Sequence, residues 1–244
     1  HNIGDIEISS HAGNDMNRVR FSSKFAEGSF VGSRFFSGFI RDLQTVTTRR
    51  ELPSLYDNAG ESWSGNRYDI SFRMHDSKDI LSFFAPGVYI ADSTALSLNI
   101  DRNGEMKAAL RSGRLAYKDK YIKKADLRIS NEGGSLRGRL TADEIMASPI
   151  LLRSGRLMAA AHDDSLSVGF SYDNATEQEN RGEILMDGRL SRDADDLLVI
   201  TSMLRPSYIY LKSNLWRLAS SGIRIGGGRT HVDSLVIKGE EQSI

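Results

Sequence analysis

The sequence predicts a mainly β protein built as an antiparallel meander. From about residue 91 onward, apolar and polar residues alternate with a period of two, which is typical of strands with one apolar and one polar face. Turn sequences such as DRNGEM, NEGGSL and YDNATEQENRGE separate these runs, and the Asn-Gly of RNGE favours a β-hairpin. Strands joined by short turns pair with their neighbours in sequence, so the sheet is expected to follow the chain order.

The chain is expected to form one elongated β domain over residues 1–244, long enough to bury a core. Lys+Arg and Asp+Glu both number 32, and the basic residues are scattered along the sequence. This composition predicts no nucleic-acid partner and gives no polybasic run for a membrane surface. Cysteine is absent, which excludes disulfides and thiolate metal sites. No apolar run has the roughly 18–20 residues of a membrane span.

The first ninety residues mix strands with helices. Ile3–Ile8 and Val19–Phe25 are expected to be strands, separated by the long loop SSHAGNDMN. A helical insertion is predicted over about residues 33–56, with its amphipathic helix from about Ser33 to Arg50 and a stop near Pro53. The apolar residues that recur there at helical spacing are Phe35, Phe36, Phe39, Ile40, Leu43 and Val46.

A second, short helix is predicted over about residues 77–85. NRYDISFRMHD returns to alternation, and SKDILSFFA follows it with Ser77 as the expected N-cap and Pro86 as the stop. The helices are expected to cover an end or an open side of the sheet. The alternative is that the first helix binds a partner.

The sequence carries no pattern of a catalytic or metal site. The five histidines, His1, His11, His75, His162 and His231, lack the i, i+4 spacing of a helical zinc pair. HDD at 162–164 and DADD at 193–196 lack the spacing of a calcium loop, and GGG at 226–228 lacks the Lys-Ser/Thr of a phosphate loop. All three are therefore predicted to be turns, and the chain is expected to be no enzyme, with no cofactor and no metal.

Two long stretches resemble a known family. ADSTALSLNIDRNGEMKAALRSGRLAYKDKYIKKADLRIS and SYIYLKSNLWRLASSGIRIGGGRTHVDSLVIKGEEQSI are similar to TamB/AsmA-like proteins, in particular the long TamB-like chains of Bacteroidetes. The NLWRL, SGIRI and VDSLVIKG segments carry most of the likeness. The segment EGSFVGSRFFSGFIRDLQTVTTRRELPSLYDN also resembles the helical insertion of that group.

The resemblance implies a fold and a function. The sheet would fold into a trough or taco-like open sandwich with an apolar inner face, and this chain would be a fragment of a longer repetitive protein. The parent would be periplasmic, anchored at the inner membrane, and would carry phospholipid acyl chains toward the outer membrane with an outer-membrane barrel of the Omp85 type. Dimers through open sheet edges would also be compatible with such a fold.

Several alternatives remain open at the level of sequence. The apolar faces would fill a closed sandwich core as well as an open groove. The chain would also suit a structural or assembly platform for outer-membrane protein biogenesis, or a β-sandwich binding module. If the face is a lipid groove, its candidate residues are Leu96, Leu98, Ile100, Met106, Leu110, Leu127, Ile129, Leu166, Val168, Phe170, Ile184, Met186, Ile209, Leu211, Trp216, Leu218, Ile223, Ile225, Leu235 and Ile237.

Overall fold

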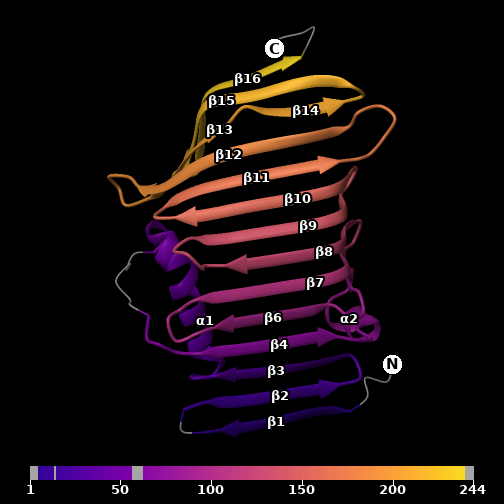
Figure 1. Cartoon of the computed structure of the whole chain (residues 1–244), viewed down its shortest axis with the longest axis vertical. Helices are drawn as coiled ribbons and strands as arrows, with labels where there is room; N and C mark the ends of the chain where they lie inside the picture. Colours follow the sequence, from indigo (N-terminus) through magenta and orange to yellow (C-terminus); the bar gives the residue numbers. More distant parts are fainter. Residues whose placement is uncertain (1–4, 14, 57–62, 240–244) are drawn as a thin grey trace.

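The computed structural model describes residues 5–13, 15–56 and 63–239. Within these residues, sixteen strands form one continuous antiparallel sheet, and Figure 1 shows them stacked in chain order between the two termini. The strands are β1 (Ile6–Ala12), β2 (Asn17–Ser23), β3 (Ala26–Gly32), β4 (Tyr68–Met74), β5 (Val88–Ile90), β6 (Ala95–Ile100), β7 (Met106–Tyr117), β8 (Lys120–Ser130), β9 (Leu136–Ala147), β10 (Ile150–His162), β11 (Ser165–Asp173), β12 (Arg181–Arg192), β13 (Leu198–Leu204), β14 (Ser207–Leu211), β15 (Asn214–Gly226) and β16 (Arg229–Gly239).

The sheet is a meander throughout, which confirms the predicted fold class. In two places, two short strands lie end to end and together occupy a single strand position of the sheet. β13 and β14 both run antiparallel to β12, with Leu204 opposite Met186 and Tyr208 opposite Glu183, and the chain between them contains Pro206. β5 and β6 likewise both pair with β7. If each of these pairs is counted as one strand position, every strand position is bonded only to the positions that come before and after it along the chain.

The N-terminal strands differ from the expectation. β1 begins at Ile6 and continues to Ala12, so most of the predicted loop is strand, while residues 1–4 lie outside the described part. Its pairing with β2 along all seven residues overrides the low apolar content of SSHA. β3 was not predicted at all, because AEGSFVG contains two glycines and no regular alternation. Gly32 is required there, since a Cβ would lie 2.6 Å from Cδ1 of Tyr68 on the paired strand.

The helical insertion is present, but it is shorter and less regular than predicted. It consists of α1 (Phe36–Gln44), a π-helical turn at Thr45–Arg49 and a 3-10 turn at Pro53–Leu55. The predicted apolar stripe is only partly buried. Phe39 and Val46 are 6% and 2% exposed, whereas Phe36 is 65% exposed. Phe35 and Ile40 are also exposed, so the stripe is wider than the part that contacts the sheet.

Buried polar groups attach the insertion to the sheet. The side chain of Asn131 is 1% exposed, and its Nδ2 donates to the carbonyls of Val46 and Gly104 while its Oδ1 accepts from the Met106 amide. Farther along, the Asp164 carboxylate accepts hydrogen bonds from the amide and the hydroxyl of Ser54. These bonds fix the insertion at two points of the sheet.

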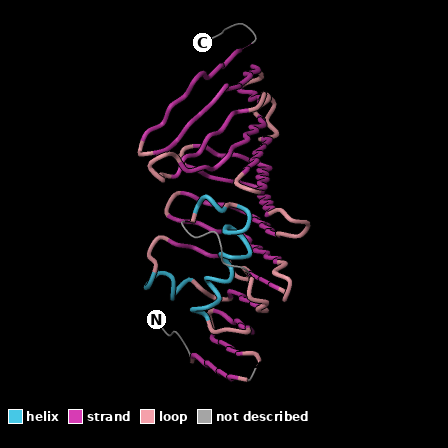
Figure 2. Tube along the Cα trace, turned by 90° about the vertical axis from the view of Figure 1, so that its left-hand side faces the viewer, coloured by secondary structure: helices cyan, strands magenta, loops and turns pink. Residues whose placement is uncertain are grey.

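Apolar contacts complete this attachment in two clusters. The first contains Phe39, Val46, Tyr68, Ile100 and Met106. The second contains Leu52, Ala161 and Leu190. Figure 1 places α1 at one end of the middle strands, and Figure 2 shows no helix beside the C-terminal strands. The insertion therefore covers one end of the middle strands, and α2 lies at their other end (Figure 1).

The second helix, α2 (Lys78–Phe84), is confirmed, and Ser77 occupies its N-cap position as predicted. The Ser77 hydroxyl makes no capping bond. It donates instead to the carbonyl of Ile90, at 2.9 Å, and the residue is buried. Ser77 thus ties the helix to β5. Phe83 and Phe84 on α2 are 72% and 70% exposed.

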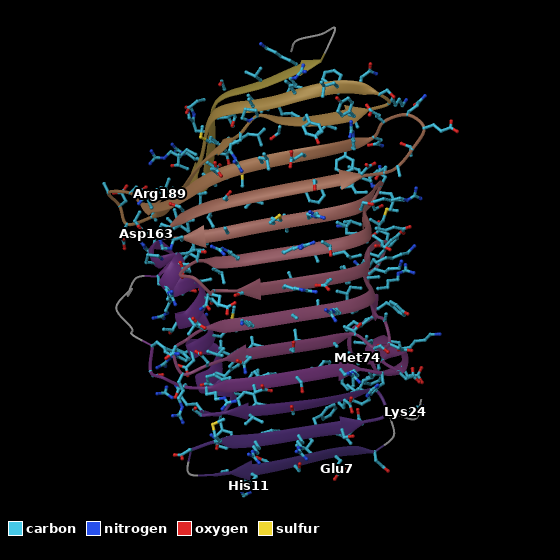
Figure 3. All side chains as sticks on the ribbon, in the orientation of Figure 1. Glu7, His11, Lys24, Met74, Asp163 and Arg189 are labelled. Atoms are coloured by element: carbon cyan, nitrogen blue, oxygen red, sulfur yellow. The ribbon has the colours of Figure 1, made fainter. Side chains whose placement is uncertain are left out.

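The predicted turns are turns, although HDD is not a freely solvated one. Asp163 and Asp164 have positive φ between β10 and β11, and Asp164 is held by Ser54. Figure 3 shows Asp163 at the strand ends beside the insertion. In DADD, Oδ1 of Asp193 accepts from the amides of Asp195 and Leu197. Gly227 and Gly228 have positive φ between β15 and β16, the conformation that glycine favours.

Candidate functional site

All twenty candidate positions lie on one face of the sheet. Directly opposed residues of an antiparallel pair point to the same face, so the strand register identifies the face of every residue. One row of opposed residues crosses the sheet from β2 to β13. Its members are Val19, Phe30, Ile70, Leu98, Ala108, Ile129, Gly138, Ala159, Val168, Met186 and Leu204.

A second row runs parallel to the first, two residues farther from the helical insertion. It reaches from β1 to β12 and carries more large side chains than the first. Its members are Ile8, Phe21, Gly28, Phe72, Leu96, Leu110, Leu127, Leu140, Leu157, Phe170 and Ile184. On the other side of the first row, Ile100, Met106 and Leu166 share the same face. We call this surface the apolar face.

The apolar face continues into the C-terminal strands. Gly182 of β12 is opposite Ile209, which is opposite Trp216, and Leu218 is opposite Ile237. Ile223 and Ile225 reach the face through β13, opposite Ser202 and Ile200. Strict alternation would place them on the face opposite to Leu218. A bulge at Ser220–Ile223 shifts the register, so they point to the same face as Leu218. Leu211 lies two residues after Ile209, and Leu235 lies two residues before Ile237, so both share their face.

Sequence reasoning missed a further row of this face. Leu115, Ile122, Ile145 and Leu152 oppose one another across β7 to β10. The side chain of Ile145 points to the apolar face, since a Cβ on Gly155 would lie 2.6 Å from its Cδ1. These residues have the opposite parity from Leu127, Leu140 and Leu157, because local irregularities interrupt the pairing. Lys124 and Ser154 have positive φ there, and a strict period of two does not detect such a shift.

The apolar face is open over most of its area. Ile100, Met106 and Tyr68, which lie under the insertion, are 0%, 2% and 0% exposed. By contrast, Phe72, Leu96 and Leu157 are 37%, 39% and 36% exposed, and Leu98, Leu127 and Phe170 are half-buried. No second layer of the described chain covers this central region. The structure therefore rejects the closed sandwich core and shows an open, apolar surface.

The opposite face is polar and rich in arginine. Arg111 lies on it, as the alternation predicts, and Lys123 lies on it because the irregularity at Lys124 shifts the alternation there. Arg111 and Arg128 both bind the Asp126 carboxylate, and the hydrogen bond from Arg128 is the main cause that lowers the pKa of Asp126. Lys123 contacts Glu144 at 2.6 Å and lowers its pKa in the same way. Many of the basic residues that look scattered in the sequence are thus gathered on the polar face of the central strands, among them Arg111, Arg128, Arg137, Arg139 and Arg156.

The described residues hold no group of three or more His, Asp or Glu side chains arranged for a metal ion. Among the helices described here, none is long and apolar enough to cross a membrane. Comparison of the chain with protein-family models, with curated proteins and with solved structures finds no match.

Proposed function

We propose that the apolar face binds the acyl chains of phospholipids and that this chain is part of a lipid-transfer protein. The observation that carries the proposal is the continuity of the open apolar face from β1 to β16. Soluble monomers rarely expose a contiguous apolar area larger than a few hundred Å², and larger areas mark sites for apolar ligands or partners.

The dimensions of the face suit a lipid carrier. Moving a 16-carbon chain into water costs about 12 kcal/mol, at about 0.8 kcal/mol per methylene group. A carrier must replace this contact along its whole length. The sixteen strands occupy fourteen strand positions across the sheet, because β5 shares a position with β6 and β13 shares one with β14. With about 4.8 Å between neighbouring strand positions, the face extends over about 60 Å in the direction across the strands.

The helical insertion forms one boundary of the binding surface. It fills the end of the face with its own side chains, Phe39, Val46 and Leu52. An acyl chain would lie beside it, across Leu96, Leu157 and Phe170. The head group would stay in water, so the apolar face needs no buried charge to bind it.

The resemblance to TamB/AsmA-like proteins supports a specific setting for this activity. In that setting the parent protein would be periplasmic and anchored at the inner membrane, and an outer-membrane barrel of the Omp85 type would receive the lipid. An open meander with one apolar face is the architecture that this setting requires.

Photo-crosslinking at two neighbouring residues tests the proposal. Leu96 and Ser97 are adjacent on β6 and both exposed, but they point to opposite faces. A photoreactive phenylalanine analogue at Leu96 is expected to form lipid adducts in cells, and the same group at Ser97 is not. Leu98, Phe170 and Leu211 provide further positions on the apolar face, with Arg111 and Lys123 as controls on the polar face. Equal labelling of both faces, or labelling of neither, would reject the proposal.

A further inference from the structure

The polar face contains a hollow of about 640 Å³ over β8 to β12, with Arg205 just past the end of β13 at its border. Five arginines line it, with Glu183 as the only carboxylate among the lining residues. Its floor consists of small side chains on β8, β10 and β11, which leave the arginines standing above it. We call this feature the arginine hollow, and its arginines are Arg128, Arg137, Arg139, Arg156 and Arg205.

Three of these arginines are not neutralised within the described chain. Arg128 shares Asp126 with Arg111, and Arg205 contacts Asp187 at 3.2 Å. Arg137, Arg139 and Arg156 make no ion pair and no side-chain hydrogen bond with any described residue. In addition, Arg139 stands directly opposite Arg128 in the β8–β9 ladder. Like charges in this position destabilise a sheet, so the fold by itself gains nothing from the arrangement.

The spacing of the three arginines suits anionic groups. Arg137 and Arg139 are two residues apart on β9, which separates their Cα atoms by about 7 Å. Arg156 lies on the next strand, diagonal to Arg139. A guanidinium group binds phosphate through two parallel N–H donors. The hollow therefore offers several phosphate-binding groups within the width of two strands.

Apolar side chains beside the arginines indicate which kind of anion binds. Met158, which lines the hollow, is 54% exposed, and Leu185 lines it next to Glu183. A free phosphate has no contact to make with these side chains, whereas the glycerol and upper acyl region of a lipid does. A single-stranded nucleic acid would need aromatic side chains for base stacking, and the polar-face residues that line the hollow include none.

From this juxtaposition of unpaired arginines and exposed apolar side chains, we propose that the arginine hollow binds the head groups of anionic phospholipids at a bilayer surface. This site lies on the opposite side of the sheet from the apolar face. It is independent of acyl-chain binding, and it gives the protein an electrostatic contact with a membrane.

Vesicle flotation with the full chain tests the inference. The protein is expected to float with phosphatidylcholine vesicles that contain 30% phosphatidylglycerol, and to do so less as the salt concentration rises. The triple variant Arg137→Gln/Arg139→Gln/Arg156→Gln is expected to lower the partition coefficient about a hundredfold, from about a fivefold loss per arginine. The matched control is Arg18→Gln/Arg20→Gln/Arg224→Gln, which removes the same charge from exposed positions outside the hollow and is expected to bind nearly as wild type does.

Three results would overturn the inference. Equal losses in the two triple variants would assign the binding to overall charge and not to the hollow. Equal flotation with pure phosphatidylcholine would assign it to the apolar face. Tighter binding of inorganic pyrophosphate or of an oligothymidylate than of the anionic vesicles would assign the hollow to a soluble anion or a nucleic acid. Circular dichroism confirms that each variant is folded.

Discussion

Ile100 and Leu96 lie on the same strand, on the same face, four residues apart, yet they meet different surroundings. Ile100 is 0% exposed and packs under the helical insertion, whereas Leu96 is 39% exposed. Both have the same place in the apolar–polar alternation of β6. The comparison shows that alternation assigns a residue to a face, and that the insertion decides whether the face is a core or an open surface.

The covered and open regions also differ in their polar groups. In the covered region, Asp42 is buried and accepts hydrogen bonds from Tyr68 and Asn66, at 2.5 and 2.6 Å, and Asn131 bridges the insertion to two strands. The buried polar contacts described away from the insertion are smaller, such as the one between the hydroxyls of Thr94 and Ser112. The covered region therefore combines apolar packing with the more extensive hydrogen bonding.

The largest expected difference comes from truncating the two residues of β6. Ile100→Ala is expected to lower the free energy of unfolding by about 2–5 kcal/mol, because it leaves a cavity in the covered core. Leu96→Ala is expected to cost about 1 kcal/mol or less, since its side chain already contacts water. Denaturant unfolding of both variants measures the difference. Equal losses would mean that the open face is packed in solution.

A slightly smaller effect is expected at the bridge between the insertion and the sheet. Asn131→Leu removes the partners of one amide and two carbonyls, all buried, and is expected to cost about 2–4 kcal/mol. Asn103→Ala, at an exposed position in the nearby turn, is the control and is expected to cost little. Hydrogen exchange should show faster opening of residues 36–49 in Asn131→Leu. Unchanged exchange there would show that the amide does not hold the insertion.

Tyr68 is expected to make the covered region sensitive to high pH. Burial, reinforced by the hydrogen bond to Asp42, raises the pKa of Tyr68 well above its ordinary value of 10.0. The folded state therefore keeps this proton while the unfolded state loses it, so stability is fully present below about pH 10 and falls above it. Above pH 10, the free energy of unfolding of the wild type is expected to fall, relative to that of Tyr68→Phe, by up to about 1.4 kcal/mol per pH unit. At neutral pH, Tyr68→Phe is expected to cost about 1–2 kcal/mol.

Parallel unfolding curves for the two proteins above pH 10 would contradict this interpretation. Comparing them at each pH cancels the other tyrosines and the lysines.

The smallest effect on stability and the largest on lipid binding are expected at Leu157. Leu157→Arg places a charge where the side chain reaches water, so it is expected to cost about 1 kcal/mol or less and to abolish lipid crosslinking at Phe170. Ala161→Arg, on the same strand and face, is the matched comparison. Ala161 is 6% exposed beneath Leu52, and an unpaired charge there is expected to unfold the domain. A folded Ala161→Arg protein would show that the insertion detaches.

The helices show where sequence reasoning reaches its limit. The spacing of Phe39, Leu43 and Val46 predicts an amphipathic helix, but it does not show that Phe36 and Ile40 stay exposed, because helical spacing carries no information about the width of the contacted surface. Ser77 has the sequence of an N-cap, yet its hydroxyl donates to Ile90, a partner 13 residues away that no local pattern identifies.

The sequence by itself determined that neighbouring strands pair and which face most candidate residues take, because short turns force neighbouring strands to pair and a period of two assigns side chains to faces. It did not determine the face of Ile223 and Ile225, which depends on the bulge in β15. Only the tertiary structure decided that the apolar face is open in the middle and closed at one end. It also decided that the shifted residues Ile122, Ile145 and Leu152 join that face, and that Arg137, Arg139 and Arg156 gather without partners on the other. These outcomes depend on bulges and on contacts between distant segments, which local alternation cannot encode.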